Sequence, residues 1–99
     1  MGDLTWPIVR DHVAGCVTVR ESEIVAAMKL IFERMKLVVE PSGAVGLAAA
    51  LSPQFASQFG RAREAGGPPL RVGVVLCGGN LDLAPLWAAV AKNSADNFK

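Results

Sequence analysis

The clearest periodicity in the chain lies between residues 21 and 36. Ile24, Met28, Ile31 and Met35 recur at spacings of four, three and four positions, which predicts a helix with one apolar face. Glutamates stand at its N-terminal end, where negative charge interacts favourably with the helix dipole. We therefore expect this helix to pack in the core, with both methionines on its buried face.

A second pattern is the apolar run Leu70–Cys77, which contains three valines and two leucines without clean alternation. Such a run predicts a strand that is covered on both faces. The short stretch 16–19 predicts a second strand. Because two strands alone do not make a stable sheet, we expect residues outside this chain to complete it.

Capping residues and prolines predict the other helices. Thr5, Ser52 and Asp82 each precede an apolar segment as expected for an N-cap, and Pro41 presets a first helical turn. These patterns together predict an α/β fold, a three-layer α/β/α fragment with about two strands and four to five helices.

The helix that Pro41 opens contains two interior glycines, Gly43 and Gly46. Each costs a helix about 1 kcal/mol relative to alanine. Their presence predicts that another backbone or a ligand comes close to that face.

The composition is unusual for a small chain. Of 99 residues, 52% are hydrophobic and 19% are charged, although small domains have the most surface per residue to cover with polar groups. We expect some apolar side chains to face another chain or a missing part of the fold; an ordinary small domain is the alternative.

Charge and motifs exclude several classes of protein. The net charge is +1 with no basic stripe, which argues against nucleic-acid binding. The longest nearly uncharged run is interrupted by Pro41 and Pro53 and does not suit a membrane span, and the N-terminus does not resemble a signal peptide. Two cysteines, Cys16 and Cys77, and one histidine do not predict a metal site. A cytoplasmic protein without a disulfide is expected.

The run Leu70–Cys77 ends in Gly78, Gly79 and Asn80. In open α/β folds the carboxyl edge of the sheet is where ligands bind. Four groups can converge at this edge: the thiol of Cys77, the backbone N–H groups of Gly78 and Gly79, and the amide of Asn80. The sequence therefore predicts a site for a flat ligand there.

Two long motifs carry a resemblance to a known family. The run Glu33–Gly46, followed by Val74–Asn80, closely resembles the serine racemases and the serine and threonine dehydratases, which are fold-type II pyridoxal-phosphate enzymes. The opening Gly2–Asp11 is similar to the serine racemase branch. The resemblance implies that residues 1–92 form the C-terminal part of the large cofactor-binding domain, in a tryptophan synthase β-like fold, and that residues 93–99 are a frayed tail.

The resemblance also implies roles for individual residues. Cys77 stands where the family places a serine, threonine or cysteine facing the pyridine nitrogen of the cofactor. A thiol is a weak, neutral partner, so the nitrogen is not driven to protonate. Gly78 and Gly79 let the backbone pass close to the ring edge, and Glu40 matches a glutamate that lines the pocket. Asn80 is expected to fix the turn and to lie near an interface where a nucleotide effector binds.

The departures from the family pattern concern the rest of the cofactor site. The family's covalently bound lysine lies in a Ser-x-Lys-x-Arg-Gly type of motif, and none of the four lysines here has that context: Lys29, Lys36, Lys92 and Lys99. The phosphate-binding glycine loop and the acidic cation ligands are also missing. Covalent catalysis by this family needs the lysine. We therefore expect this chain alone to be inactive, with no catalytic residue of its own.

In the intact enzyme, the resemblance implies pyridoxal 5'-phosphate as cofactor, with a divalent cation and a nucleotide effector as further ligands. The substrate would be serine or threonine. Serine would be racemised or lose water to give pyruvate and ammonia, and threonine would give 2-oxobutanoate and ammonia. The balance between the two reactions, the oligomeric state and the status of Met1 as a start remain open.

Several residues have a second interpretation. Cys77 alone would suit a buried structural cysteine, and Glu40 would suit a carboxylate that favours the helix dipole. Ser42 satisfies backbone groups or touches the ligand, and Lys36 is interpreted as a solvated helix residue. For the whole chain, the alternative is a non-catalytic protein that dimerises, or pairs with the missing part of the fold, through its apolar surface.

Overall fold

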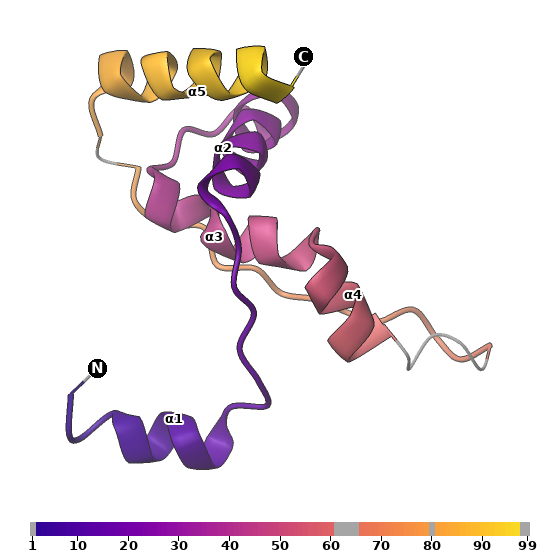
Figure 1. Cartoon of the computed structure of the whole chain (residues 1–99). Coiled ribbons are helices and arrows are strands. Elements are labelled where there is room, and N and C mark those ends of the chain that lie inside the picture. Colours follow the sequence, from indigo (N-terminus) through magenta and orange to yellow (C-terminus); the bar gives the residue numbers. More distant parts are fainter. Residues whose placement is uncertain (1, 61–65, 80, 98–99) are drawn as a thin grey trace.

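The chain folds into helices joined by extended segments (Figure 1). The computed structural model describes residues 2–60, 66–79 and 81–97. The elements in chain order are α1 (Trp6–His12), α2 (Glu21–Leu30), the π-helix η1 (Ile31–Met35), α3 (Pro41–Ala50), α4 (Pro53–Phe59) and α5 (Leu83–Asn97). None of the helices in these ranges is long and apolar enough to cross a membrane.

The core lies where α2 packs against α3 on one side and α5 on another. Met28 and the fully buried Ile31 belong to this core, together with Val39 and two alanines of α3. The predicted apolar face of residues 24–35 is therefore confirmed for these two residues. Met35 differs from the prediction: it is the last residue of the π-helix, whose wider turn breaks the α-helical spacing, and it is 50% exposed.

The π-helix was not predicted. Its wider turn follows α2 directly and ends at Lys36, which adopts a left-handed conformation with φ of 60°. The ammonium group of Lys36 donates a hydrogen bond of 2.6 Å to the carbonyl of Glu33. A cation bound to a terminal carbonyl is favourable at the C-terminal end of a helix, so Lys36 stabilises the end of η1.

The two predicted strands are not confirmed. Residues 16–19 and 70–79 form no β-ladder within the described part of the chain. Residues 70–79 run in an extended form past α3 (Figure 1). Val74 and Leu76 are half-buried, whereas Val75 is 83% exposed, so the segment is not covered on both faces. A strand requires a neighbouring backbone at ladder distance, and the described residues do not supply one.

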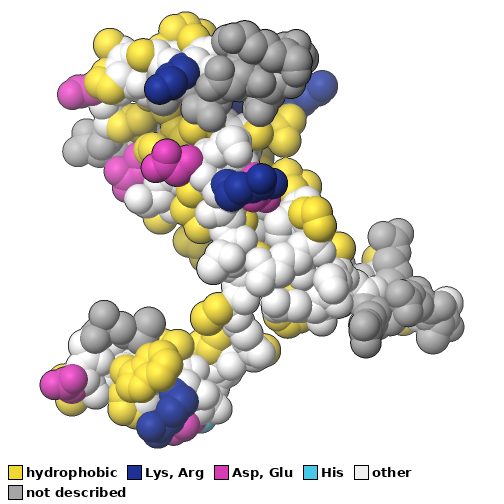
Figure 2. Space-filling view, viewed as in Figure 1, with side chains coloured by type: hydrophobic (Ala, Val, Ile, Leu, Met, Phe, Trp, Pro, Cys, Tyr) yellow, Lys and Arg dark blue, Asp and Glu magenta, His cyan; other side chains and the backbone are white. Residues whose placement is uncertain are grey.

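The chain does not close around its apolar residues. Its radius of gyration is 15.8 Å, compared with about 13 Å for a compact domain of this length. Helix α1 stands apart from the other helices (Figure 1) and buries none of its residues. Apolar side chains gather on its surface (Figure 2), among them Trp6 and Ile8, which are exposed. The predicted surplus of apolar surface is present.

The helix ends differ in how far they follow the predicted caps. Ser52 caps α4, because its hydroxyl accepts the backbone N–H of Phe55 at 3.2 Å. Thr5 does not cap α1; its hydroxyl instead donates to the carbonyl of Gly2 at 3.3 Å. Helix α5 continues to Asn97, through most of the stretch that the sequence predicts to be a tail.

Replacing Glu23 with glutamine is expected to remove the acid sensitivity of the start of α2. The Glu23 carboxylate accepts the backbone N–H of Arg20 at 3.1 Å and its Nε at 3.2 Å. The backbone bond first, and then the side-chain bond, lowers the pKa of Glu23 below its usual 4.5. Because the folded pKa is lowered, this stabilisation is present above the ordinary pKa and is lost as the pH falls through the folded value.

Far-ultraviolet circular dichroism during an acid titration measures this effect. The natural chain should lose helical signal in the acid range below the usual pKa of Glu23, and this loss should be smaller in Glu23→Gln. Glu21→Gln removes a carboxylate from the same helix end but leaves the bonds between Glu23 and Arg20 in place, so it is the matched control and should retain most of the loss. Identical curves for all three proteins would contradict the assignment.

Candidate functional site

The turn after the extended segment lies against the start of α3. The backbone N–H of Glu40 donates a hydrogen bond of 2.7 Å to the carbonyl of Gly78. Glu40 is the N-cap residue of α3 with extended backbone angles, so this bond joins the helix start to the turn. Two positions that are 38 residues apart in sequence, 40 and 78, are thereby brought together.

Gly43 and Gly46 are the positions where the extended segment approaches α3. A Cβ atom on Gly43 would overlap the carbonyl oxygen of Cys77 and lie 2.8 Å from its carbonyl carbon. A Cβ atom on Gly46 would lie 3.1 Å from a methyl group of Val74. The expected close approach to this helix face is thus made by another backbone segment of the same chain.

Gly78 is required for two separate reasons. Its φ of +75° is a left-handed conformation that residues with a side chain rarely adopt. The side chain of Glu40 also occupies the space that a Cβ atom on Gly78 would need. Gly79 has more room, because a Cβ atom there would lie at ordinary contact distance, 3.6 Å, from the carbonyl of Val38. Gly78 therefore sets the shape of the turn.

Cys77 is a free, exposed cysteine, so its interpretation as a buried structural residue is wrong for this chain. Its carbonyl oxygen is packed against Gly43, as described above. The structure brings four of the predicted residues together: Glu40, Cys77, Gly78 and Gly79. The fifth, Asn80, lies outside the described residues.

Groups that would complete a catalytic site are not gathered at this turn. Lys36 binds the end of its own helix, as expected for a helix lysine. In the part of the chain that the structure describes, no three His, Cys, Asp or Glu side chains come together as a metal site. What the turn offers chemically is a thiol and backbone groups, with a carboxylate behind them.

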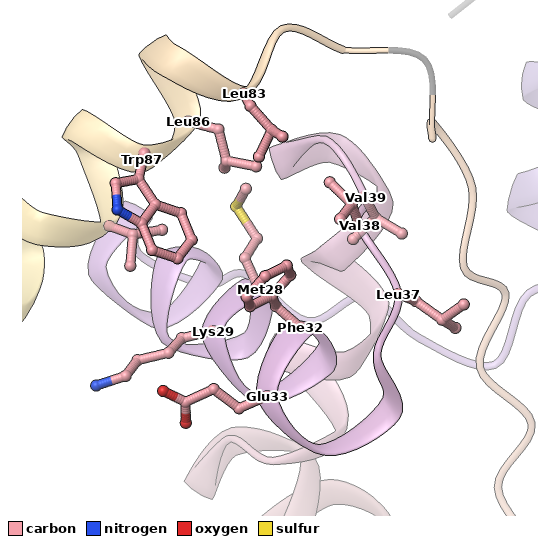
Figure 3. A pocket seen from close by; sticks show the side chains of 11 residues that line it. Met28, Lys29, Phe32, Glu33, Leu37, Val38, Val39, Leu83, Leu86 and Trp87 are labelled. Atoms are coloured by element: carbon pink, nitrogen blue, oxygen red, sulfur yellow. The ribbon is translucent and has the colours of Figure 1, made fainter.

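A second feature was not singled out from the sequence. An apolar cavity lies between α2, η1, residues 37–39 and α5 (Figure 3). Phe32 and Trp87 form part of its wall, with ring centroids 5.5 Å apart and an interplanar angle of 74°. The spacing of Leu83, Leu86 and Val90 on α5 is the sequence signal that indicates an apolar helix face there.

Comparison with known proteins gives the family. Residues 1–78 match the family model described as "Pyridoxal-phosphate dependent enzyme". The chain is 51% identical over 91 residues to serine racemase of Arabidopsis thaliana, covering 88% of this chain and 25% of that protein. It is 40% identical over 85 residues to L-threo-3-hydroxyaspartate ammonia-lyase of a Pseudomonas species, covering 84% of this chain and 23% of that protein.

A solved structure of maize serine racemase is similar with a TM-score of 0.74 at 45% identity, over 92% of this chain and 27% of the maize chain. This likeness supports the predicted fold-type II architecture. The chain spans about a quarter of the length of the relatives it matches.

The turn at residues 77–79 presents groups that suit one edge of a flat pyridine ring. A small polar side chain can lie beside the ring nitrogen, and backbone without a side chain can lie beside the ring edge. Cys77 is exposed and carries a thiol, and Gly79 is exposed and has no side chain. The family model covers most of the chain, and the relatives include racemases and a lyase. The chain therefore belongs to the pyridoxal-phosphate dependent enzymes.

Proposed function

We propose that this chain supplies the C-terminal part of the large cofactor-binding domain of a serine racemase or a serine/threonine dehydratase, with residues 1–92 as that part. The observation that carries the proposal is the turn at residues 77–79, held by Glu40 and α3 in a chain that is 51% identical to a serine racemase. The tail expected from the sequence at residues 93–99 is not part of the proposal, because α5 continues to Asn97.

The proposed role of each site residue follows from its place in the turn. The Cys77 thiol faces the ring nitrogen as a weak, neutral hydrogen-bond partner, and the exposed backbone of Gly79 lies along the ring edge. Gly78 and Glu40 position this backbone through their contact and hydrogen bond. Asn80, which lies outside the described residues, is included in the proposal on the family resemblance alone. Pyridoxal phosphate, when bound, supplies the electron sink for the reaction.

The proposed reaction of the intact enzyme is racemisation of serine, or elimination of water from serine or threonine with release of ammonia. A neutral partner at the ring nitrogen limits delocalisation of negative charge into the ring, which suits loss of a β-hydroxyl group. A divalent cation and a nucleotide effector would bind through residues that this chain mostly lacks. A dimeric, cytoplasmic enzyme is part of the proposal.

A chimera tests the proposal. The chain would replace the aligned quarter of Arabidopsis thaliana serine racemase, and serine racemisation and pyruvate formation would be measured. We expect the chimera to retain pyridoxal phosphate and to turn over serine, and the chain alone to form no lysine-linked cofactor detectable by borohydride reduction and mass spectrometry. A folded chimera without cofactor, or a chain that binds and turns over alone, would contradict the proposal.

Within that chimera, Cys77→Ala is expected to lower kcat/KM about five- to tenfold, because one weak hydrogen bond contributes about 1 kcal/mol. Cys77→Ser keeps a neutral donor and should retain most of the activity. Cys16→Ala is the matched control, since Cys16 is also a free and exposed cysteine. Equal activity of the Cys77→Ala and Cys16→Ala proteins would show that the thiol has no such role.

A non-catalytic interaction protein is the second candidate. It is favoured by the exposed apolar side chains on α1, a helix that buries none of its residues. Apolar patches of this kind mark sites of protein association. Light scattering after size-exclusion chromatography distinguishes the two. A stable self-associated form that stays inactive after fusion to the rest of the enzyme would support this candidate, and a folded monomer would exclude self-association.

A further inference from the structure

The cavity between α2, η1 and α5 has a volume of about 150 Å³. Met28 points into it from α2 toward Leu86, with Trp87 on one side and Val39 on the other (Figure 3). All of its walls come from this chain. None of the four described residues of the proposed cofactor turn lines it, so it is separate from that site.

The aromatic pair forms a wall with hollows on both sides. Phe32 and Trp87 meet edge to face, and Phe32 is 39% exposed. A shallower hollow lined by Phe32, Leu83, Ala84 and Trp87 adjoins the cavity through the residues that both share. The two partly exposed rings therefore separate the cavity from the surface on this side. We expect a small molecule to enter there.

The chemistry of the lining determines what can bind. Among the described lining residues, Lys29 and Glu33 carry charge, and Figure 3 shows their charged ends at one edge of the cavity, away from Met28. A charged ligand among the apolar side chains would lose its hydration and gain no oppositely charged group in exchange, which costs free energy. Apolar cavities of this size stay dry and bind benzene-sized molecules. Two aromatic walls also favour another ring in offset or edge-to-face contact.

We propose that this cavity is a binding site for a small neutral aromatic molecule, between benzene and indole in size. The ring lies between Met28, Leu86 and the Phe32–Trp87 pair. A polar substituent is tolerated at the edge beside Lys29 and Glu33. The site is lined by residues of α2, η1, residues 37–39 and α5, and the proposal does not depend on the proposed cofactor function.

Fluorobenzene is the probe, followed by fluorine NMR on the full chain. Saturable broadening or shift of its signal is expected, with a dissociation constant of about 0.1–1 mM for a ligand of this size. Val90→Phe adds a ring to a lining position of α5 and should weaken binding at least tenfold. Ala91→Phe adds the same ring at the neighbouring exposed position, which does not line the cavity, and should leave binding unchanged.

A second measurement follows Trp87 directly. The chain has two tryptophans, so Trp6→Phe leaves Trp87 as the single fluorophore. Fluorobenzene should then change the emission of Trp87 over the same concentration range as the NMR signal. Circular dichroism confirms that each variant is folded. Absence of saturable binding by the folded natural chain, or equal binding by the Val90→Phe and Ala91→Phe proteins, would overturn the proposal.

Discussion

Replacing Gly78 with alanine is expected to release the turn from α3 and to cause a large loss of function. A left-handed conformation costs a residue with a side chain about 1–2 kcal/mol. The new Cβ atom would in addition overlap the Glu40 side chain. Because both effects act on the residue next to Cys77, the Gly78→Ala chimera should lose pyridoxal phosphate during dialysis, as measured by absorbance.

Two controls separate the causes. Gly66 has a similar φ of +71°, and among the described residues no atom lies within 4 Å of the place that a Cβ atom would take there. Gly66→Ala therefore carries the conformational cost alone and should retain the cofactor. Combining Gly78→Ala with Glu40→Ala removes the overlapping side chain. The double variant should recover part of the stability lost by Gly78→Ala, with a coupling energy of about 0.5–3 kcal/mol. Additive effects would show that the Glu40 side chain does not restrict residue 78.

Replacing Ile31 with alanine should destabilise the helical core most strongly. Ile31 is fully buried at the junction of α2 and η1, and truncation of a buried isoleucine costs about 2–5 kcal/mol. That amount is comparable with the whole stability of many small domains. We expect loss of cooperative thermal unfolding in the isolated chain and a lower unfolding temperature in the chimera.

The neighbouring Leu30 provides the matched control, because it is 40% exposed on the same helix. Leu30→Ala should lower the unfolding free energy much less than Ile31→Ala. Ile31→Val, which removes a single methyl group, should fall between them at about 0.5–1.5 kcal/mol. If Leu30→Ala were the more damaging change, the assignment of the core face would be wrong.

The helices could be predicted because their signals are local. The spacing of Ile24, Met28 and Ile31 and the cap at Ser52 depend on residues within a few positions of each other. The strands could not be confirmed because a strand depends on a neighbouring backbone, and the neighbours for residues 70–79 do not lie within the described chain. A run of valines therefore indicates an extended conformation, but it does not identify the backbone segment that would pair with it.

The site could be predicted only in part for the same reason. The glycines at 43, 46 and 78 indicate close approach or unusual backbone angles, and both occur. Their partners, the Cys77 backbone, Val74 and Glu40, are remote in sequence and are visible only in the structure. The π-helix and the aromatic contact between Phe32 and Trp87 likewise depend on how α2 and α5 meet.

The extended segment 70–79 has a consequence for handling the isolated protein. Its backbone forms no ladder in the described chain, and Val72 and Val75 are exposed. An unpaired, apolar edge of this kind is a template for pairing with another copy and for aggregation. Leu70–Cys77 carries a single charge, on Arg71, which is a weak barrier to such stacking. The isolated chain should therefore aggregate when it is concentrated above the dilute conditions used for spectroscopy, and a partner segment that pairs with this edge should keep it in solution.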